Sequence, residues 1–314
     1  MENLSSQGHD VEKGIFVFRN LQSKYNPEVL DFNYCNGYIL QSTRSYFEYH
    51  CDEENIVILS KKDGVYVITT YVANDFVTFI KKLLNNLEPD RLIIKNVSKT
   101  ERLKFIEAGF RECAEHEKWD EVSKYDDNTF PELVVDCDNL VKLNGPDFQS
   151  LREDVARFNR DYSISVEKFN PDDFNVIKDL FDKWVNNMRE RNGWPEDQLT
   201  ESTKVLFTDK FGIINYIIRD SRNNKIIGWM NFSEISNICL GFNVLVNNFD
   251  YYNLYRIMMI EAAKIAQELG YKYLNLQGSE DEGQFSSKLR MKPEIQLEKV
   301  HLIYDKGFLT NPMR

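Results

Sequence analysis

A short stretch near the C-terminus, LNLQGSEDEGQFSSKLRMKP at residues 274–293, combines residue types that can bind an anion or stabilise developing negative charge. An apolar strand pattern ends there in a glycine and three acidic residues, 280–282, and three cations follow: Lys288, Arg290 and Lys292. The ammonium of Lys288, a few residues beyond a strand end, can stabilise an oxyanion or a leaving oxygen, so we predict it as the catalytic residue. The alternative is a solvated lysine on a surface helix, because most charged side chains lie outside the core. Positions two and four residues apart cannot all share one helical face, so Arg290 should point away from Lys288.

Two arginines further upstream are the next candidates for contact with a ligand. Arg152 and Arg157 lie five positions apart in a predicted helix at 148–162. At about 100° per residue they are separated by about 140° around the helix axis. One of them can therefore face a ligand while the other binds a backbone carbonyl or a carboxylate. The alternative for Arg157 is an ordinary pair with Glu153 one helical turn away.

These candidates need strands and helices to position them, and the first half of the sequence contains both. Residues 55–60 and 65–72 read as a hairpin, because two apolar β-rich runs flank a short turn. An amphipathic helix is predicted at 75–87, a strand at 91–97 and a short helix at 98–109. The order is therefore hairpin, helix, strand, helix.

The second half repeats that order at a larger scale. Two helices, 148–162 and 171–191, come first. The elements expected after them are three antiparallel strands, a long helix, a strand, the cationic helix and a last strand, at 214–220, 225–235, 237–246, 251–270, 271–277, 284–292 and 300–305. Two such units in tandem indicate a duplicated domain.

The fold class expected from this order is α/β, or α+β, in two tandem domains with mixed sheets. The breakers Asn144, Gly145 and Pro146 mark the boundary between the two units. We therefore predict an N-terminal domain at 1–140 and a C-terminal domain at 141–314.

Composition narrows the class of protein further. The 314 residues carry a net charge of −11, which argues against broad nonspecific nucleic-acid binding but leaves room for a local basic groove. The sequence has no apolar run long enough to cross a bilayer, so we expect no transmembrane segment and a cytoplasmic protein. A lone C-x-x-H pair, Cys113 and His116, lacks the second ligand pair that zinc requires, so no metal site is predicted. The sequence also lacks the H-E-x-x-H, G-x-S-x-G and Walker patterns.

Three features resemble known transferases. The element order resembles the Gcn5-related acetyltransferase (GNAT) fold, and its tandem form resembles the Fem peptidoglycan ligases. Two segments, 138–162 and 274–293, resemble the phosphatidylglycerol lysyltransferase C-terminal-like family, also catalogued as DUF2156. The matching positions are Leu143, Gly145, Arg152, Arg157 and Phe158 in the first segment and Asn275, Asp281, Gly283, Lys288 and Pro293 in the second.

The resemblance implies two GNAT-like domains that face each other across a cleft, and an acyltransferase that takes an aminoacyl group from aminoacyl-tRNA. The acceptor would be an amine or hydroxyl of a small molecule, a peptide or a lipid headgroup. The resemblance also implies Lys288 as the catalytic residue. The substrate-binding residues on this reading are Arg152, Arg157, Asn275, Gly283 and Arg290.

Two alternatives remain open, a coenzyme A-dependent N-acyltransferase and a catalytically inactive binding module. A GNAT enzyme usually holds the pyrophosphate of coenzyme A on a glycine-rich turn at a helix start. The corresponding segment here, VNNFDYYNLYR at 246–256, contains no glycine, and neither does VANDFVTF at 72–79. We therefore expect weak or no binding of coenzyme A and no cofactor.

Overall fold

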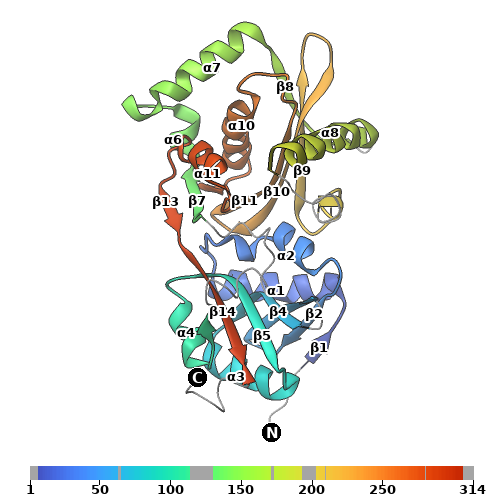
Figure 1. Ribbon diagram of the computed structural model, residues 1–314, viewed down its shortest axis with the longest axis vertical. Helices are drawn as coiled ribbons and strands as arrows, with labels where there is room; N and C mark the ends of the chain where they lie inside the picture. The colour runs from blue at the N-terminus through green and yellow to red at the C-terminus, as the bar shows by residue number, and fades with distance from the viewer. Residues whose placement is uncertain are drawn as a thin grey trace.

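Two lobes, each built on its own seven-stranded sheet, are stacked along the long axis of the computed structural model (Figure 1). The structure describes residues 6–62, 65–113, 130–170, 173–192, 203–208, 210–279 and 281–306. Both sheets mix parallel and antiparallel neighbours, with helices packed against them. The expected α+β class with mixed sheets is confirmed.

The sheet of the first lobe contains the predicted hairpin at its centre. Its strands, in spatial order, are β1 (Ser6–Gly8), β2 (Glu48–Cys51), β3 (Asn55–Lys62), β4 (Val65–Ala73), β5 (Arg91–Ser98), β14 (Lys299–Asp305) and β6 (Arg111–Glu112). Only the β4–β5 pair is parallel among the described strands of this sheet. Successive side chains of a strand point to opposite faces of a sheet, so those of β3 and β4 contribute alternately to two hydrophobic cores, one on each face.

Helices cover both faces of this first sheet. One face packs against α3 (Phe76–Leu87), predicted from its apolar spacing, and α4 (Arg102–Glu107), predicted from the signals at its two ends. The carboxylate of Asp75 caps α3 by accepting from the amide of Thr78 at 3.3 Å. The other face packs against elements for which the sequence analysis makes no prediction: α1 (Val11–Tyr25), η1 (Phe32–Tyr34) and α2 (Asn36–Thr43).

The sheet of the second lobe contains the predicted three-stranded meander. Its strands, in spatial order, are β13 (Ile295–Leu297), β7 (Glu132–Asp136), β12 (Tyr273–Asn275), β11 (Cys239–Asn247), β10 (Lys225–Ser236), β9 (Ile213–Asp220) and β8 (Ile164–Lys168). The β11–β12 pair is parallel and the other pairs are antiparallel.

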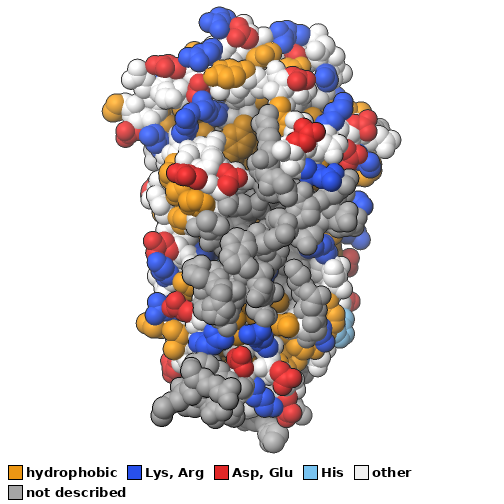
Figure 2. Space-filling view, viewed as in Figure 1, with side chains coloured by type: hydrophobic (Ala, Val, Ile, Leu, Met, Phe, Trp, Pro, Cys, Tyr) orange, Lys and Arg blue, Asp and Glu red, His pale blue; other side chains and the backbone are white. Residues whose placement is uncertain are grey.

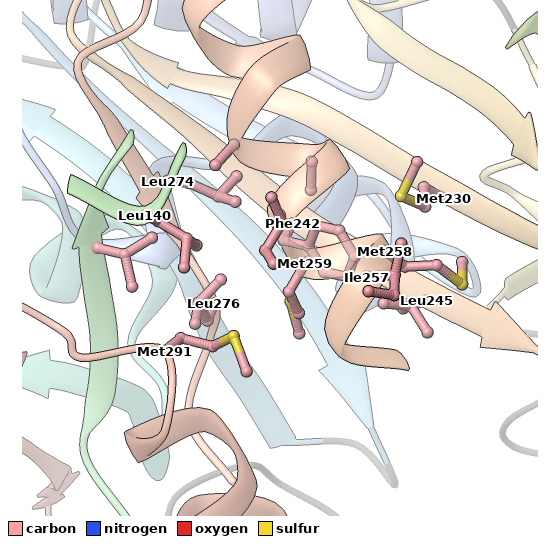
Figure 3. Close-up of a cluster of buried hydrophobic side chains, with 14 of the residues drawn as sticks. Leu140, Met230, Phe242, Leu245, Ile257, Met258, Met259, Leu274, Leu276 and Met291 are labelled. Atoms are coloured by element: carbon pink, nitrogen blue, oxygen red, sulfur yellow. The ribbon is translucent and has the colours of Figure 1, made fainter. Parts of the chain in front are cut away.

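Helices also cover the second sheet on both faces. The elements on or beside it are α6 (Cys137–Lys142), η2 (Pro146–Phe148), α7 (Gln149–Asp161), α8 (Phe174–Asn192), α10 (Leu254–Glu268) and α11 (Glu282–Leu289). The apolar face of α10 packs against the sheet through a core rich in methionine (Figure 3). Gly270, at φ 92°, ends α10 and lets the amide of Tyr271 bond back to the carbonyl of Ala266 at 2.9 Å. The long helix predicted at 251–270 is confirmed.

The lobes exchange strands. Strand β7 precedes the predicted boundary but joins the second sheet, and β14 follows it but joins the first. We predicted 300–305 as a further strand of the second unit, and this assignment is wrong. Leu302 and Ile303 are fully buried where β14 covers the edge of β5, and sequence pattern does not specify that partner. The ranges 1–140 and 141–314 stay a prediction, and each sheet takes one strand from across the boundary.

A buried ionic cluster joins the lobes where the chain crosses between them. The ammonium of Lys299, whose side chain is 3% exposed, lies 2.6 Å from a carboxylate oxygen of Asp31 and 2.9 Å from one of Glu132. Asp31 belongs to the first lobe and Glu132 to β7 of the second sheet. Burial opposes the charged form of Lys299, but the two carboxylates outweigh it and raise the pKa of the ammonium.

Two glycines let the lobes approach closely beside this cluster. A Cβ at Gly37 in α2 would lie 2.3 Å from the side chain of Asn243, and one at Gly241 would lie 2.8 Å from the sulfur of Cys35. The amide of Gly37 donates to the hydroxyl of Ser233 at 2.9 Å. The region where the two lobes meet, called the waist below, is therefore packed and hydrogen-bonded around α2.

No helix in the described ranges has both the length and the apolar character that a bilayer crossing requires.

We predict that Lys299→Met lowers the free energy of unfolding by about 3–5 kcal/mol, because it leaves two buried carboxylates without their cation. The matched control is Lys99→Met, which removes an ion pair to Glu298 whose side chains are 54% and 62% exposed. That change should cost no more than about 0.5 kcal/mol. Urea unfolding of both variants measures the difference, and equal midpoints would contradict the role of the cluster.

Candidate active site

The loop after β12 and the helix α11 hold the predicted catalytic lysine. Strand β12 ends at Asn275, and the backbone then turns through Gln277 at φ 64°. Helix α11 begins after Asp281, whose carboxylate accepts from the amide of Gln284 at 2.8 Å. A Cβ at Gly283 would lie 3.0 Å from that carboxylate, so glycine at this position leaves room for the cap. Gly283 thus shapes the start of the helix that carries Lys288.

Lys288 is partly buried on the last turn of α11 and folds back over the loop, where its ammonium donates to the carbonyl of Gly278. The ammonium is therefore held beside the loop at the carboxyl end of β12, and its place at the mouth between the two domains stays a prediction. The predicted cationic helix is shorter than expected, because α11 ends at Leu289. Buried Met291 packs into the core (Figure 3), and the flanking Arg290 and Lys292 are exposed. Arg290 is thus more exposed than Lys288, and its direction relative to Lys288 stays a prediction.

Ser279, between Gly278 and the acidic residues, was not predicted as a site residue. It is fully buried, and its hydroxyl has no hydrogen-bond partner among the described residues. The loop around it is held by a bridge to Phe130, whose ring stacks on Phe285 with centroids 4.7 Å apart. A buried, unsatisfied hydroxyl is uncommon and marks a position where a ligand atom can be bound. The signal in the sequence was the small, polar Gly-Ser pair directly after the strand.

The parallel strands β11 and β12 part just before this loop. They pair only from Cys239 to Gly241 on β11. Beyond that point the side-chain amide of Gln277 donates to the carbonyls of Phe242 at 2.6 Å and Asn243 at 2.9 Å. The split between the strands is thus filled by a side chain of the protein.

The start of α10 also differs from a phosphate-binding turn. Asn253 precedes the helix at φ 62°, and its side-chain amide donates to the carboxylate of Asp154 at 2.9 Å. Arg256 forms an ion pair with the same carboxylate, which is 6% exposed as a residue. Asp154 thus already supplies the anion at this helix start, where a phosphate-binding turn would hold its ligand. This geometry agrees with the absence of glycine in 246–256.

A profile of the family described as phosphatidylglycerol lysyltransferase, C-terminal, matches residues 38–305. The chain belongs to this family. No curated protein matches its sequence.

Solved structures share the fold of this lysyltransferase-family chain across nearly its whole length. A conserved protein of unknown function from Bacteroides thetaiotaomicron is similar with a TM-score of 0.75 and 18% identity, over 95% of this chain and 99% of its own. L-PGS from Bacillus licheniformis has a TM-score of 0.65 and 15% identity, over 95% and 93% of the two chains. FemX has a TM-score of 0.63 and 9% identity, over 98% and 100%. The predicted tandem GNAT-like, Fem-like fold is confirmed.

The two arginines that match the family's first segment lie in different surroundings on α7. Arg152 donates to the carbonyls of Leu143 at 2.5 Å and Gly145 at 2.8 Å, and so holds a turn whose two residues have φ of 52° and 86°. Arg157 is exposed. Its alternative partner, Glu153, accepts instead from Gln149 at 3.1 Å, and no Glu153–Arg157 pair occurs in the described residues. Their contact with substrate stays a prediction, which the exposed Arg157 fits better.

Asn275, which matches the family's second segment, is fully buried. Its side-chain amide donates to the carbonyl of Leu30 at 2.7 Å and to Glu132 at 2.9 Å, and its oxygen accepts from the amide of Gln277 at 2.7 Å. It therefore links the waist cluster to the start of the Lys288 loop. A direct contact with substrate stays a prediction, as does a role for exposed Arg290. Two other sequence positions, residue 280 of the acidic triplet and His116, lie outside the described residues.

We predict that Arg152→Ala lowers the free energy of unfolding by about 1–2 kcal/mol, because two carbonyls of a left-handed turn lose a charged donor. Arg157→Ala, on the same helix, should change it by no more than about 0.5 kcal/mol. Thermal unfolding of the two variants measures both effects. A larger loss for Arg157→Ala than for Arg152→Ala would show that the roles are reversed.

Proposed function

We propose that the protein is an aminoacyltransferase, which moves an aminoacyl group from aminoacyl-tRNA to an amine or hydroxyl of an acceptor. The observation that carries the proposal is the family match over residues 38–305, combined with the position of Lys288 at the end of β12. The acceptor would be a small molecule, a peptide or a lipid headgroup.

The reaction needs little covalent participation by the protein. The acceptor nitrogen or oxygen forms a bond to the ester carbonyl of the donor, and the bond from that carbon to the ribose oxygen breaks. The proton lost by the acceptor balances the proton gained by the ribose hydroxyl. Lys288 would stabilise the oxyanion or the leaving oxygen, and the unpartnered hydroxyl of Ser279 would supply a second donor. An ammonium has three N–H donors, so its bond to Gly278 is compatible with this role.

The geometry favours aminoacyl-tRNA over coenzyme A as the source of the transferred group. Gln277 fills the split between the parallel strands, and the carboxylate of Asp154 lies beside the start of α10. A transfer RNA, by contrast, can be held by exposed cations on a surface. Figure 2 shows Lys and Arg side chains spread over the upper lobe among acidic ones, and Arg157 and Arg160 are exposed on α7 of that lobe. Because the net charge of −11 repels the phosphates of tRNA, only such a local basic surface would hold the tRNA.

The direct test is transfer of a radiolabelled amino acid from aminoacyl-tRNA to a panel of amine and hydroxyl acceptors. We predict that Lys288→Ala lowers the transfer rate about 100- to 1000-fold, as removal of an oxyanion-hole donor does. Its melting temperature should fall only slightly, because Lys288 is partly exposed and a lost hydrogen bond costs about 1 kcal/mol. Lys81→Ala, an exposed lysine on α3 of the first lobe, is the matched control and should transfer at the wild-type rate.

Three results would contradict the proposal. The first is an acetyl-CoA complex by calorimetry together with acyl transfer from it, which would make the protein a coenzyme A-dependent enzyme. The second is binding of aminoacyl-tRNA with no transfer to any acceptor, which would make it a binding module. The third is a loss of activity in Lys288→Ala that only follows unfolding, which would remove Lys288 from the site.

A further inference from the structure

A polar cavity lies in the first lobe, at the edge of its sheet. It has a volume of about 460 Å³, within the usual range for small-ligand pockets. It is lined by residues from β1, β2, β4, the end of α3 and the segments beside β1 and β2: Gln7, His9, Tyr46, Glu48, His50, Tyr66, Asn86 and Leu87. None of these residues takes part in the proposed transfer reaction.

A buried carboxylate forms the base of this cavity. Glu48 is 2% exposed and accepts hydrogen bonds from Gln7 at 2.7 Å, from His50 at 2.6 Å and from the hydroxyl of Tyr46. Burial opposes its ionisation, but the hydrogen bonds from Tyr46 and His50 outweigh burial and lower the pKa of Glu48. The cavity therefore contains a fixed negative charge near neutral pH.

The carboxylate of Glu48 takes one donor each from Gln7, Tyr46 and His50, and acceptor atoms of the lining remain beside it. An ionised carboxylate only accepts, so the Nε2 atom of His50 carries its proton and Nδ1 presents a lone pair. The Nδ1 atom of His9 lies 2.9 Å from the carbonyl of Phe47, which also only accepts, so Nδ1 carries a proton, and Nε2 is an acceptor when the ring carries that proton alone. Gln7 donates through its nitrogen, and its oxygen stays an acceptor. No hydrogen bond within the described residues reaches these three acceptor atoms.

The walls of the cavity are aromatic and already attract a cation. The rings of Tyr46 and Tyr66 meet edge to face with centroids 6.3 Å apart, and His9 meets Tyr46 at 5.8 Å. The ammonium of exposed Lys61 lies 4.6 Å from the ring centroid of Tyr66 and 5.9 Å from that of Tyr46. Both distances are within the range of a cation–π interaction.

We propose that this cavity binds the primary ammonium group of a small molecule. Three neutral acceptors match the three N–H donors of an ammonium, Glu48 balances its charge, and the tyrosine rings face its positive end. A quaternary ammonium lacks the donors, and a carboxylate or phosphate would be repelled by the charge of Glu48. Lys61 is an internal competitor that a ligand displaces from the rings. The proposal is independent of the transfer reaction, because its residues lie in the other lobe.

The test is a titration of the full-length protein with n-butylammonium chloride, followed by the imidazole NMR signals of His9 and His50. We expect saturable shifts of both signals, weaker binding of tetramethylammonium and no binding of butyrate. Glu48→Gln should weaken n-butylammonium binding by about tenfold or more, because the negative charge that balances the ammonium is lost. Lys61→Ala should strengthen it by removing the competitor, and Tyr66→Leu should weaken it. Lys13→Ala, an exposed lysine on α1 of the same lobe, is the control and should bind like the wild type.

Circular dichroism of Glu48→Gln shows whether that buried substitution leaves the fold intact. If it unfolds the protein, Lys61→Ala and Tyr66→Leu decide instead, because neither side chain is fully buried. Absence of saturable shifts in the wild type overturns the proposal. So do equal affinities of the wild type, Lys61→Ala and Tyr66→Leu, or an unchanged affinity in folded Glu48→Gln.

Discussion

The buried ammonium of Lys299 is the contact on which the arrangement of the two lobes depends. Three charged side chains from distant parts of the chain meet in the waist, where water cannot solvate them. Each buried charge costs several kcal/mol unless its partners are in place. Asp31 and Glu132 belong to different lobes, so the pairing is complete only when the lobes dock in this one orientation. The cluster therefore specifies the geometry of the waist more than it adds to net stability.

The candidate active site inherits its position from this waist. Glu132 accepts from Asn275 as well as from the amide of Phe32, and Asn275 accepts in turn from the amide of Gln277. The loop that carries Lys288 thus starts from a point that is hydrogen-bonded to both lobes. A shift of one lobe against the other would move the end of β12 and the ammonium with it.

The rest of the waist is polar but satisfied, which explains how two sheets pack closely without a purely apolar interface. The hydroxyl of Ser233 lies 2.7 Å from the sulfur of Cys35, and Asn243 continues the chain of hydrogen bonds to Asn231 at 2.7 Å. Asn231 then reaches Asn215 at 2.7 Å, well inside the second lobe. Buried polar groups of this kind disfavour alternative packings, because any shift leaves several of them unpaired.

The sequence by itself determined the local elements and the family. Apolar periodicity predicted β3, β4, α3, the meander β9–β11 and α10, because each pattern reports the contacts of one segment with whatever covers it. The motif around Lys288 predicted a lysine just after a strand end, and the structure has it there. Only the tertiary structure decided which segments meet. It placed β14 in the first sheet, buried Asn275 in the waist and brought residues 31, 132 and 299 into one cluster. Strand pairing and buried ion pairs join residues that are far apart in the chain, and the period of a single segment carries no information about its partner.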